Sequence, residues 1–379
     1  MKDKTILHIF SDNVFFDGVS DFYDRVEGIR NLYYFYSPNG NPSFKHIKNT
    51  GKIRIVSNLF DYLRLFSNKD VDIVLFHSIN KSQVFLFPFI DSKKIVIWWA
   101  WGYDIYGDGV YIKALVKNKI LKPKTEHYVE RERNGRSKWY INIPLRVVYE
   151  FFRDRMISRI DYFMPCMPID YYLMKESCRK FRAKISPCGI AGTPFEFEFK
   201  TVPQNILVGN SLTYSNNHLD VFEYLYPLEI ANSRTIIVPV NYGNAFGSVD
   251  NLKNLSNFPH PNQVMWLDKM LSRDDYFRLC NSVTHAVFGA IRQQALGNIF
   301  YCLSAGVKLF LFKDSFLAKQ LKEDGYIFFS IEDDLTTDAL SKCLDRDSAE
   351  TNYQIYKDSF KNSSAEVISD FFSHIEIRK

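Results

Sequence analysis

The stretch "FGAIRQQALGNIFYCLSAGVKLFLF", residues 288–312, contains the end of one apolar run, a polar loop and a second apolar segment. Arg292, Gln293 and Gln294 interrupt the apolar pattern, and Gly297 and Asn298 follow them. Apolar runs on both sides of such a loop are typical of a buried strand followed by a helix. The spacing predicts a helix that starts near residues 297–298 and ends at Ala305 or Gly306, with Gly306 as its C-cap.

Runs rich in β-branched and aromatic residues recur along the whole chain, separated by longer amphipathic segments. The runs are nearly continuous rather than alternating, which indicates parallel strands covered on both faces. We therefore predict an α/β fold with two doubly wound parallel-sheet domains that face a cleft. The predicted strands cover residues 5–10, 32–37, 52–56, 72–77, 94–99 and 161–165, and then 205–209, 235–240, 263–267, 285–289, 307–312 and 326–330.

The length of 379 residues also favours two domains. Gly, Pro and mixed polarity interrupt the strand pattern over residues 186–205, which we interpret as the hinge. We expect residues 1–190 to form the first domain and residues 200–379 the second. The C-terminal helix is expected to pack back on the first domain.

The composition is 46% apolar and 24% charged, which fits a well-packed soluble protein. The six cysteines are scattered without C-x-x-C pairs or zinc spacing, as expected for reduced thiols in the cytoplasm. The chain enters a strand-like run at once, so no secretory signal is predicted, and no apolar run is long enough to span a membrane.

Three predicted strand exits in the second half are polar. Gly209, Asn210 and Ser211 follow the first, Asn241, Tyr242 and Gly243 the second, and the Arg292–Asn298 loop the third. Glycines allow close backbone approach, and the N-terminus of a helix offers free N–H groups to an anion. Together the three loops favour a nucleotide-diphosphate site; the alternative is three ordinary turns capped by their own side chains.

Familiar nucleotide motifs are missing. No G-x-G-x-x-G follows a strand and no G-x-x-x-x-G-K-[ST] occurs, which argues against NAD enzymes and P-loop NTPases. The two D-x-D pairs, Asp70/Asp72 and Asp345/Asp347, fall at a strand start and in a charged helix. We therefore expect a metal-free site with no cofactor, built from a helix dipole and arginine.

The order of "ILVGNS…NNH", "VPVNYG", "DDYFRLC" and "IRQQALGNIFYCLSAGV" resembles the donor domain of glycosyltransferase family 56. This is the family of TDP-N-acetylfucosamine:lipid II N-acetylfucosaminyltransferases, or 4-alpha-L-fucosyltransferases. Upstream, "ILHIFSDN", "LFHSIN" and "WAWGYDIYG" resemble the pieces of its acceptor domain. Ala295 and Asn298 depart from the glycine and threonine expected there.

The resemblance implies a GT-B fold and transfer with inversion at the anomeric carbon. It implies an enzyme that moves a deoxyamino sugar such as N-acetylfucosamine from a TDP- or UDP-sugar. The acceptor would be a lipid-diphosphate-linked glycan in the synthesis of a surface polysaccharide such as enterobacterial common antigen. Arg292, Gln293, Gln294 and Gly297 would then bind the donor's diphosphate or sugar. The alternatives are a nucleotide-sugar epimerase on the same fold and a non-catalytic nucleotide-sugar-binding subunit.

An inverting transferase needs a base for the acceptor hydroxyl. The candidates at strand exits of the first domain are Asp104, Asp12 and His77, in that order of preference. Near Asp104, the motif "WGYDIYG" also offers Trp101 and Gly102 as a sugar platform and Tyr106 as a hydroxyl donor. His8, inside the first strand, is expected in the core.

Residues 107–160 form a basic insertion. They contain 13 Lys and Arg against 6 Asp and Glu, with interleaved apolar and aromatic residues. Such a surface favours peripheral contact with an anionic membrane, here the cytoplasmic face of the inner membrane. The alternative is a solvated insertion. No nucleic-acid-binding motif accompanies the charge, so no nucleic-acid partner is expected.

Overall fold

The computed structural model describes residues 3–13, 15–107, 115–116, 119–134, 143–188, 195–258 and 261–378. The chain divides into two compact units, each formed by segments that are separated in the sequence. The first unit contains residues 1–105, 138–193 and 360–379, and the second contains residues 106–137 and 194–359.

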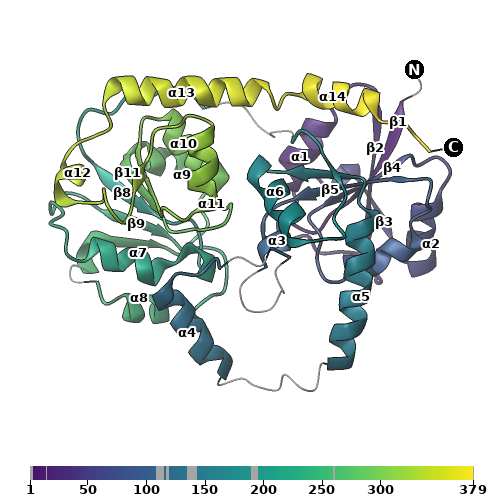
Figure 1. Ribbon diagram of the computed structural model, residues 1–379, viewed down its shortest axis with the longest axis horizontal. Helices are drawn as coiled ribbons and strands as arrows, with labels where there is room; N and C mark the ends of the chain where they lie inside the picture. The colour runs from purple at the N-terminus through teal and green to yellow at the C-terminus, as the bar shows by residue number, and fades with distance from the viewer. Residues whose placement is uncertain are drawn as a thin grey trace. The chain divides into compact units, whose positions relative to one another are not determined.

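The first unit is built on a seven-stranded parallel sheet with the order β3-β2-β1-β4-β5-β6-β7 (Figure 1). All six strands predicted for this half are present, and in β4 and β5 every residue is buried. The seventh, β7, was not predicted because it is two exposed residues without an apolar run. The strands are β1 (Lys4–Ile9), β2 (Ile29–Tyr36), β3 (Ile53–Val56), β4 (Ile73–His77), β5 (Ile95–Ala100), β6 (Tyr162–Pro165) and β7 (Lys184–Ile185).

Helices of the first unit come from all three of its segments. Within α6, Pro168 occupies the first turn, where its missing N–H costs nothing. The helices are α1 (Phe16–Tyr23), α2 (Leu59–Arg64), α3 (Tyr103–Tyr106, which ends on the first residue of the second unit), α5 (Ile143–Arg159), α6 (Pro168–Ser177) and α14 (Ala365–His374). Short 3-10 helices include η1 (Thr50–Lys52), η2 (Leu65–Ser67) and η3 (Gln83–Phe89).

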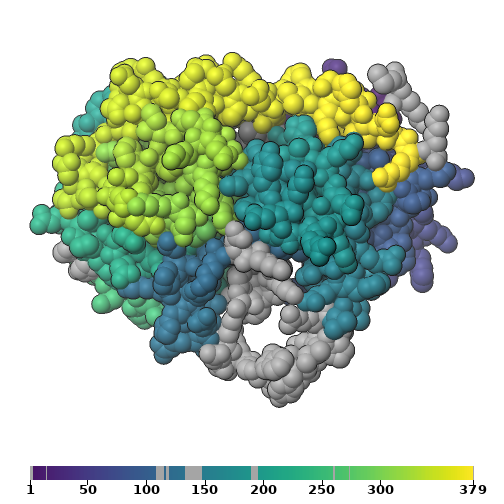
Figure 2. All heavy atoms as spheres, viewed as in Figure 1, coloured from purple at the N-terminus to yellow at the C-terminus, as the bar shows by residue number. Residues whose placement is uncertain are grey.

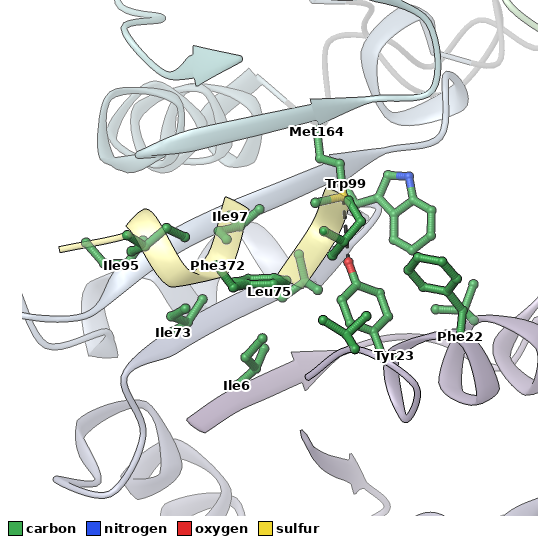
Figure 3. Close-up of a cluster of buried hydrophobic side chains, with 14 residues drawn as sticks. Ile6, Phe22, Tyr23, Ile73, Leu75, Ile95, Ile97, Trp99, Met164 and Phe372 are labelled. Carbon is green, nitrogen blue, oxygen red and sulfur yellow. Dashed lines mark hydrogen bonds between the residues drawn. The ribbon is translucent and has the colours of Figure 1, made fainter. Parts of the chain in front are cut away.

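The core of the first unit is graded along the strands. Figure 3 shows aliphatic side chains such as Ile73 and Ile95 at one end and the aromatic rings of Tyr23 and Trp99 at the other. Phe372 of α14 lies among them and is 1% exposed. Lys4 Nζ donates to the carbonyl of Phe372 at 2.5 Å, which ties the end of the chain to β1. Residues 360–379 thus group with the unit that begins the chain, and Phe372 packs in its core.

The second unit contains a six-stranded parallel sheet with the order β10-β9-β8-β11-β12-β13. All six strands predicted for this half are present, although the last is shorter than expected. They are β8 (Asn205–Val208), β9 (Ile236–Pro239), β10 (Val264–Leu267), β11 (Val283–Phe288), β12 (Lys308–Leu311) and β13 (Phe329–Ser330).

Helices cover both faces of this sheet; in Figure 1, α7 and α8 lie on one side and α9 and α10 on the other. They are α4 (Pro123–Asn134), α7 (His218–Leu225), α8 (Val249–Ser256), α9 (Arg273–Asn281), α10 (Leu296–Ser304), α11 (Phe316–Glu323), α12 (Thr337–Ser341) and α13 (Arg346–Lys361), with 3-10 helices η5 (Tyr214–Asn216) and η6 (Pro261–Gln263). Figure 2 shows α13, in yellow, at the surface of the second unit. The ring of Tyr356 on α13 lies 6.2 Å from that of Phe300 on α10.

The basic stretch is divided differently from the expectation, which placed residues 107–160 in the first domain. Residues 106–137 group with the second unit and α5 with the first. The reason is side-chain capping from α7. Asp220 accepts the backbone N–H groups of Lys124 and Thr125 at 2.8 and 3.0 Å, and Asn217 accepts that of Lys122 at 2.9 Å. Polar capping of this kind leaves no apolar periodicity in the sequence, so the stretch alone gave no sign of it.

Candidate functional site

The two sheets share one topological feature that positions ligands. In the second sheet the chain runs outward from β8 to β10 and then returns to β11 on the other side of β8. The loops after β8 and β11 therefore leave in opposite directions, and α/β folds bind ligands at the carboxyl ends of strands with this arrangement. Residues 209–217 and 289–295 form these two loops. They contain most of the residues that the sequence predicted for donor binding.

Gln294 joins the two loops. Its side chain is 8% exposed, and its Oε1 accepts a hydrogen bond from Ser215 Oγ at 2.6 Å. Its Nε2 donates to Asn210 Oδ1 at 3.0 Å and to Thr213 Oγ1 at 3.1 Å. An amide whose donor and acceptor are both used fixes the shape of the loop after β8, because a buried polar group without partners is costly.

Arg292 places a positive charge beside this amide. Its Nη1 donates to the carbonyl of Gln293 at 2.7 Å and its Nη2 to Ser215 Oγ at 3.3 Å. Burial raises the pKa of Tyr242, and Arg292 opposes that rise, as expected for a guanidinium close to the phenol. Gln293 is also buried, and within the described residues its Oε1 has no hydrogen-bond partner.

The loop after β11 ends at the N-terminus of α10. The helix starts at Leu296, one residue before the predicted start, and Gly306 follows it with φ +64° as predicted for a C-cap. Its N-cap residue is Ala295, with φ +60° and no side-chain hydrogen bond to the helix. Serines cap α8, α9 and α11 in the same unit. The first N–H groups of α10 thus stay available to an anion, beside Arg292.

Gly297 and Asn298 lie in the first turn of α10. No atom of the described residues comes within 4 Å of a Cβ built on Gly297, so packing among them does not require a glycine there. Gly297 is exposed and Asn298 is half-buried. The space beside Gly297 is open for a ligand.

The loop after β9 completes the cluster. Asn210 Nδ2 donates to the Tyr242 hydroxyl, and Leu212 N donates to the carbonyl of Tyr242 at 2.7 Å. Close approach of the backbone requires a glycine at position 243, because a Cβ there would lie 2.3 Å from Leu212 O. Asn241 is directed elsewhere, and its Nδ2 lies 3.5 Å from the carbonyl of Lys269.

Sequence reasoning gave no ligand role to Thr213, Ser215, Asn216 or His218, which the fold brings to this cluster. The run of small polar residues after Gly209 was the available signal. Asn216 Nδ2 donates to Ser211 O at 2.7 Å, so Asn216 and Ser211 hold the loop from within. Gly209 is needed for space, since its Cβ would lie 2.8 Å from His218 Nε2.

In the first unit, the carboxylates of Asp12 and Asp104 each accept three hydrogen bonds. Asp12 accepts three successive backbone N–H groups, from residues 45–47, at 2.7 to 3.1 Å. Asp104 accepts from Trp98 Nε1 at 2.7 Å, Trp101 N at 3.0 Å and Ile79 N at 3.1 Å. Burial raises the pKa of Asp104 to about 6 against these bonds. These bonds give both carboxylates a loop-anchoring function, and their assignment as the base stays a prediction.

His77 is the last residue of β4 and is 3% exposed. Its Nε2 lies 2.8 Å from Nδ1 of His8, which is buried as expected. Burial lowers the pKa values of both rings, to about 4 for His8 and well below the usual range for His77.

The predicted acceptor residues fall into two groups. Trp101 is half-buried, and its ring lies 5.2 Å from that of Phe15; Gly102 follows it with φ +94°. Tyr106 is 1% exposed and stacks on Phe316 at 5.8 Å in the second unit. Such burial does not favour Tyr106 as a sugar contact.

Among the described residues, no group of His, Cys, Asp and Glu is arranged to hold a metal ion. No described helix is both long and apolar enough to cross a bilayer.

Solved structures of glycosyltransferases share this architecture over nearly the whole chain. A UDP-forming trehalose-phosphate synthase from Burkholderia xenovorans aligns with a TM-score of 0.59 at 11% identity, covering 97% of this chain and 98% of its own. Anabaena HepE, in complex with UDP and glucose, aligns with a TM-score of 0.57 at 12% identity, covering 98% and 100%. The lipopolysaccharide outer core galactosyltransferase WaaB aligns with a TM-score of 0.55 at 11% identity, covering 96% and 99%. These likenesses confirm the predicted GT-B fold.

The fold and the family match define a GT-B glycosyltransferase. Residues 188–357 match the family described as 4-alpha-L-fucosyltransferase, glycosyl transferase group 56. The predicted resemblance is therefore confirmed over the second half of the chain. A comparison with curated proteins found no match.

Proposed function

We propose that this glycosyltransferase moves a deoxyamino sugar from a TDP- or UDP-sugar to a lipid-diphosphate-linked glycan, with inversion and without a metal. The observation that carries the proposal is the pairing of the buried Arg292 with the uncapped N-terminus of α10. Both lie at the switch point of the second sheet, where α/β folds bind ligands.

Charge explains why this pairing suits the reaction. When the bond to the sugar breaks, negative charge develops on the leaving nucleoside diphosphate. A guanidinium and the N–H groups of a helix N-terminus stabilise that charge without having to reorganise. Gln294 and Ser215 hold the guanidinium's surroundings fixed before the donor arrives.

The substrates are proposed from the family and from its likeness to known structures. The family description names a fucosyltransferase, which supports a 6-deoxy sugar in the donor. HepE holds UDP and glucose on the same fold, which supports a nucleoside diphosphate sugar as donor. We propose a role in surface-glycan synthesis with the acceptor carried on a lipid, and therefore a cytoplasmic enzyme that docks on the inner membrane.

A test of the donor site uses Gly297→Val. Because no atom of the described part of the chain lies within 4 Å of its Cβ, the variant should keep its melting temperature, while the side chain fills the space where the diphosphate approaches. Calorimetry with a panel of TDP- and UDP-sugars should show binding by the wild type and at least about tenfold weaker binding by the variant, the loss of one good hydrogen bond to an anion.

The matched control is Gly51→Val in the first unit, another glycine outside the positive-φ region, whose Cβ would make only an ordinary contact, at 3.9 Å from Asn49 Oδ1. It should leave donor binding unchanged. Product analysis then separates the alternatives: sugar transfer or slow hydrolysis supports the transferase, an isomerised donor the epimerase, and binding without turnover the subunit. Equal donor affinity in Gly297→Val and wild type would contradict the anion site.

Support for membrane docking comes from a different surface than the sequence indicated. Of the basic stretch, Lys113, Lys117 and the aromatic residues 111, 139 and 140 lie outside the described residues. Lys119, Lys122 and Lys124 form ion pairs with Glu126, Asp314 and Glu223 in the second unit. Paired lysines offer little net attraction to anionic lipid.

The first unit instead exposes large apolar side chains on adjacent elements. Val147 and Phe151 of α5 are 63% and 56% exposed, and Phe60 of α2 is 74% exposed. Both helices pack against η3, which adds the exposed Phe85. The Arg155 guanidinium lies 5.5 Å from the centre of the Phe151 ring. Exposed apolar side chains next to a cation are typical of an interfacial membrane contact.

Replacing Val147 and Phe151 together with serine should weaken co-sedimentation with phosphatidylglycerol vesicles. Burial of two such side chains contributes about 3 kcal/mol or more, so the loss should exceed about tenfold. Tyr172→Ser, which removes an equally exposed side chain on α6, is the control and should bind normally. Equal vesicle binding by the double variant would leave this face without a membrane function.

A further inference from the structure

A hydrogen-bonded chain of three side chains crosses the switch point of the first sheet. β1 and β4 are neighbours there although β2 and β3 come between them in the sequence. His77 Nε2 lies 2.8 Å from His8 Nδ1, and His8 Nε2 lies 2.9 Å from Asn31 Oδ1. Asn31 Nδ2 in turn donates to the carbonyl of Tyr23 at 3.0 Å.

The direction of each hydrogen bond in this series of side chains follows from the Tyr23 carbonyl at its far end. The carbonyl of Tyr23 can only accept, so the Asn31 amide group faces it and Asn31 Oδ1 faces His8. That oxygen also can only accept, so His8 carries its proton on Nε2 and a lone pair on Nδ1. His77 must then donate from Nε2, and a neutral His77 has its lone pair on Nδ1.

The Nδ1 lone pair of His77 is at the other end of this hydrogen-bonded series. Within the described residues, His77 Nδ1 is buried and has no hydrogen-bond partner. Leaving a buried acceptor unsatisfied costs about 1–3 kcal/mol, so its persistence calls for a function. His77 ends β4 at the sheet's switch point, the part of an α/β fold where ligands bind.

We propose that His77 Nδ1 is the general base that takes the proton of the acceptor hydroxyl, with His8 and Asn31 as positioning residues that fix its tautomer. This assignment rests on the proposed transferase function. In the step, the acceptor O–H proton moves to His77 Nδ1 and the oxygen forms a bond to the anomeric carbon. The bond from that carbon to the diphosphate breaks, and its electron pair leaves with the nucleoside diphosphate.

The surroundings of His77 agree with a neutral base. It contacts the rings of His8 on β1, Tyr23 on α1 and Trp99 on β5, and the carboxylate of Asp24 acts on the far side of His8. Burial and His8 lower the pKa of His77, so the lone pair is available throughout the neutral range. Asp12 and Asp104 accept backbone and indole N–H groups, whereas the buried His77 Nδ1 has no hydrogen-bond partner among the described residues.

His77→Gln tests the base directly. Glutamine can still donate to His8 Nδ1 but cannot take up a proton at neutral pH. We expect kcat for sugar transfer to fall by about 10²–10⁴-fold, the usual contribution of a general base. The Kd for the donor should stay within about twofold, because the donor loops are in the second unit. Transfer at near wild-type kcat would overturn the assignment.

Asn31→Asp tests the positioning residues. A carboxylate at 2.9 Å from His8 Nε2 favours the imidazolium form of the pair, so the acid limb of the kcat/KM profile should move to higher pH by about one unit or more. A purely structural asparagine would change the melting temperature and leave this limb in place. An unmoved limb in a folded, active variant would contradict the relay.

Nitrogen-15 chemical shifts of the wild-type histidines test the relay without any activity. Both His8 and His77 should be in the Nε2–H form at neutral pH. An Nδ1–H tautomer at His77 would overturn the assignment even if the enzyme transfers sugar. Failure of the wild type to transfer any sugar would contradict the proposed function itself, and the shifts would still decide the relay.

Discussion

Arg292→Ala should lower kcat for sugar transfer by about 10²–10³-fold, which corresponds to about 2.7–4 kcal/mol of transition-state stabilisation. The guanidinium is buried at the switch point of the second sheet and bonded to Ser215 Oγ and the carbonyl of Gln293. Charge on the leaving diphosphate grows as the sugar departs, so the loss should appear in kcat more than in the donor's Kd. Steady-state kinetics and calorimetry on the same preparation measure both.

Two further variants help to interpret this result, one that keeps the charge at position 292 and one that removes an exposed arginine. Arg292→Lys keeps the charge but cannot direct two N–H groups as a guanidinium does, and it should recover only part of the activity. Arg278→Ala removes an exposed arginine that pairs with Asp275 on α9, and it should change neither kcat nor stability. If Arg292→Ala folds and keeps its kcat, the positive charge of the donor site must come from another residue.

Gly243→Ala should strongly destabilise the second unit. The new Cβ would lie 2.3 Å from Leu212 O, a backbone atom that accepts a hydrogen bond from Ala245 N at 3.0 Å. Leu212 N also donates to Tyr242 O, so this backbone cannot move without losing bonds between the β8 and β9 loops. Gly243 has φ at +92°, where an alanine is also strained. We therefore expect backbone strain and atomic overlap together to lower the free energy of unfolding by about 2–5 kcal/mol.

Gly247→Ala is the matched control. Gly247 also has positive φ, at +76°, but no atom lies within 4 Å of its Cβ. The Gly247→Ala variant should lose only about 1–2 kcal/mol of unfolding free energy, from backbone strain at positive φ. Urea titrations followed by hydrogen exchange in β8 and β9 would report the second unit separately from the first. Equal losses in the two variants would show that the Leu212 contact is not tight.

The alternation of strands and helices was predictable because it depends on local apolar runs in the sequence. All twelve predicted strands are present, and the helix after the Arg292 loop starts within one residue of its predicted position. Among the strands of the described residues, only β7 was missed, since two exposed residues form no pattern. Boundaries that depend on polar capping could not be found, as with α4, which Asn217 and Asp220 attach to the second unit.

By itself, the sequence determined the two parallel sheets and the polar loops after β8, β9 and β11, because strand periodicity and glycine positions are local properties. The tertiary structure alone decided which of those polar residues meet. Strand order places β8 beside β11, so Gln294 reaches Asn210 across 84 positions of sequence. Strand order likewise places His8 against His77, which turns a residue expected only in the core into a partner of the proposed base. Asp12 and Asp104 each accept three N–H groups from neighbouring residues, and only the folded chain shows that.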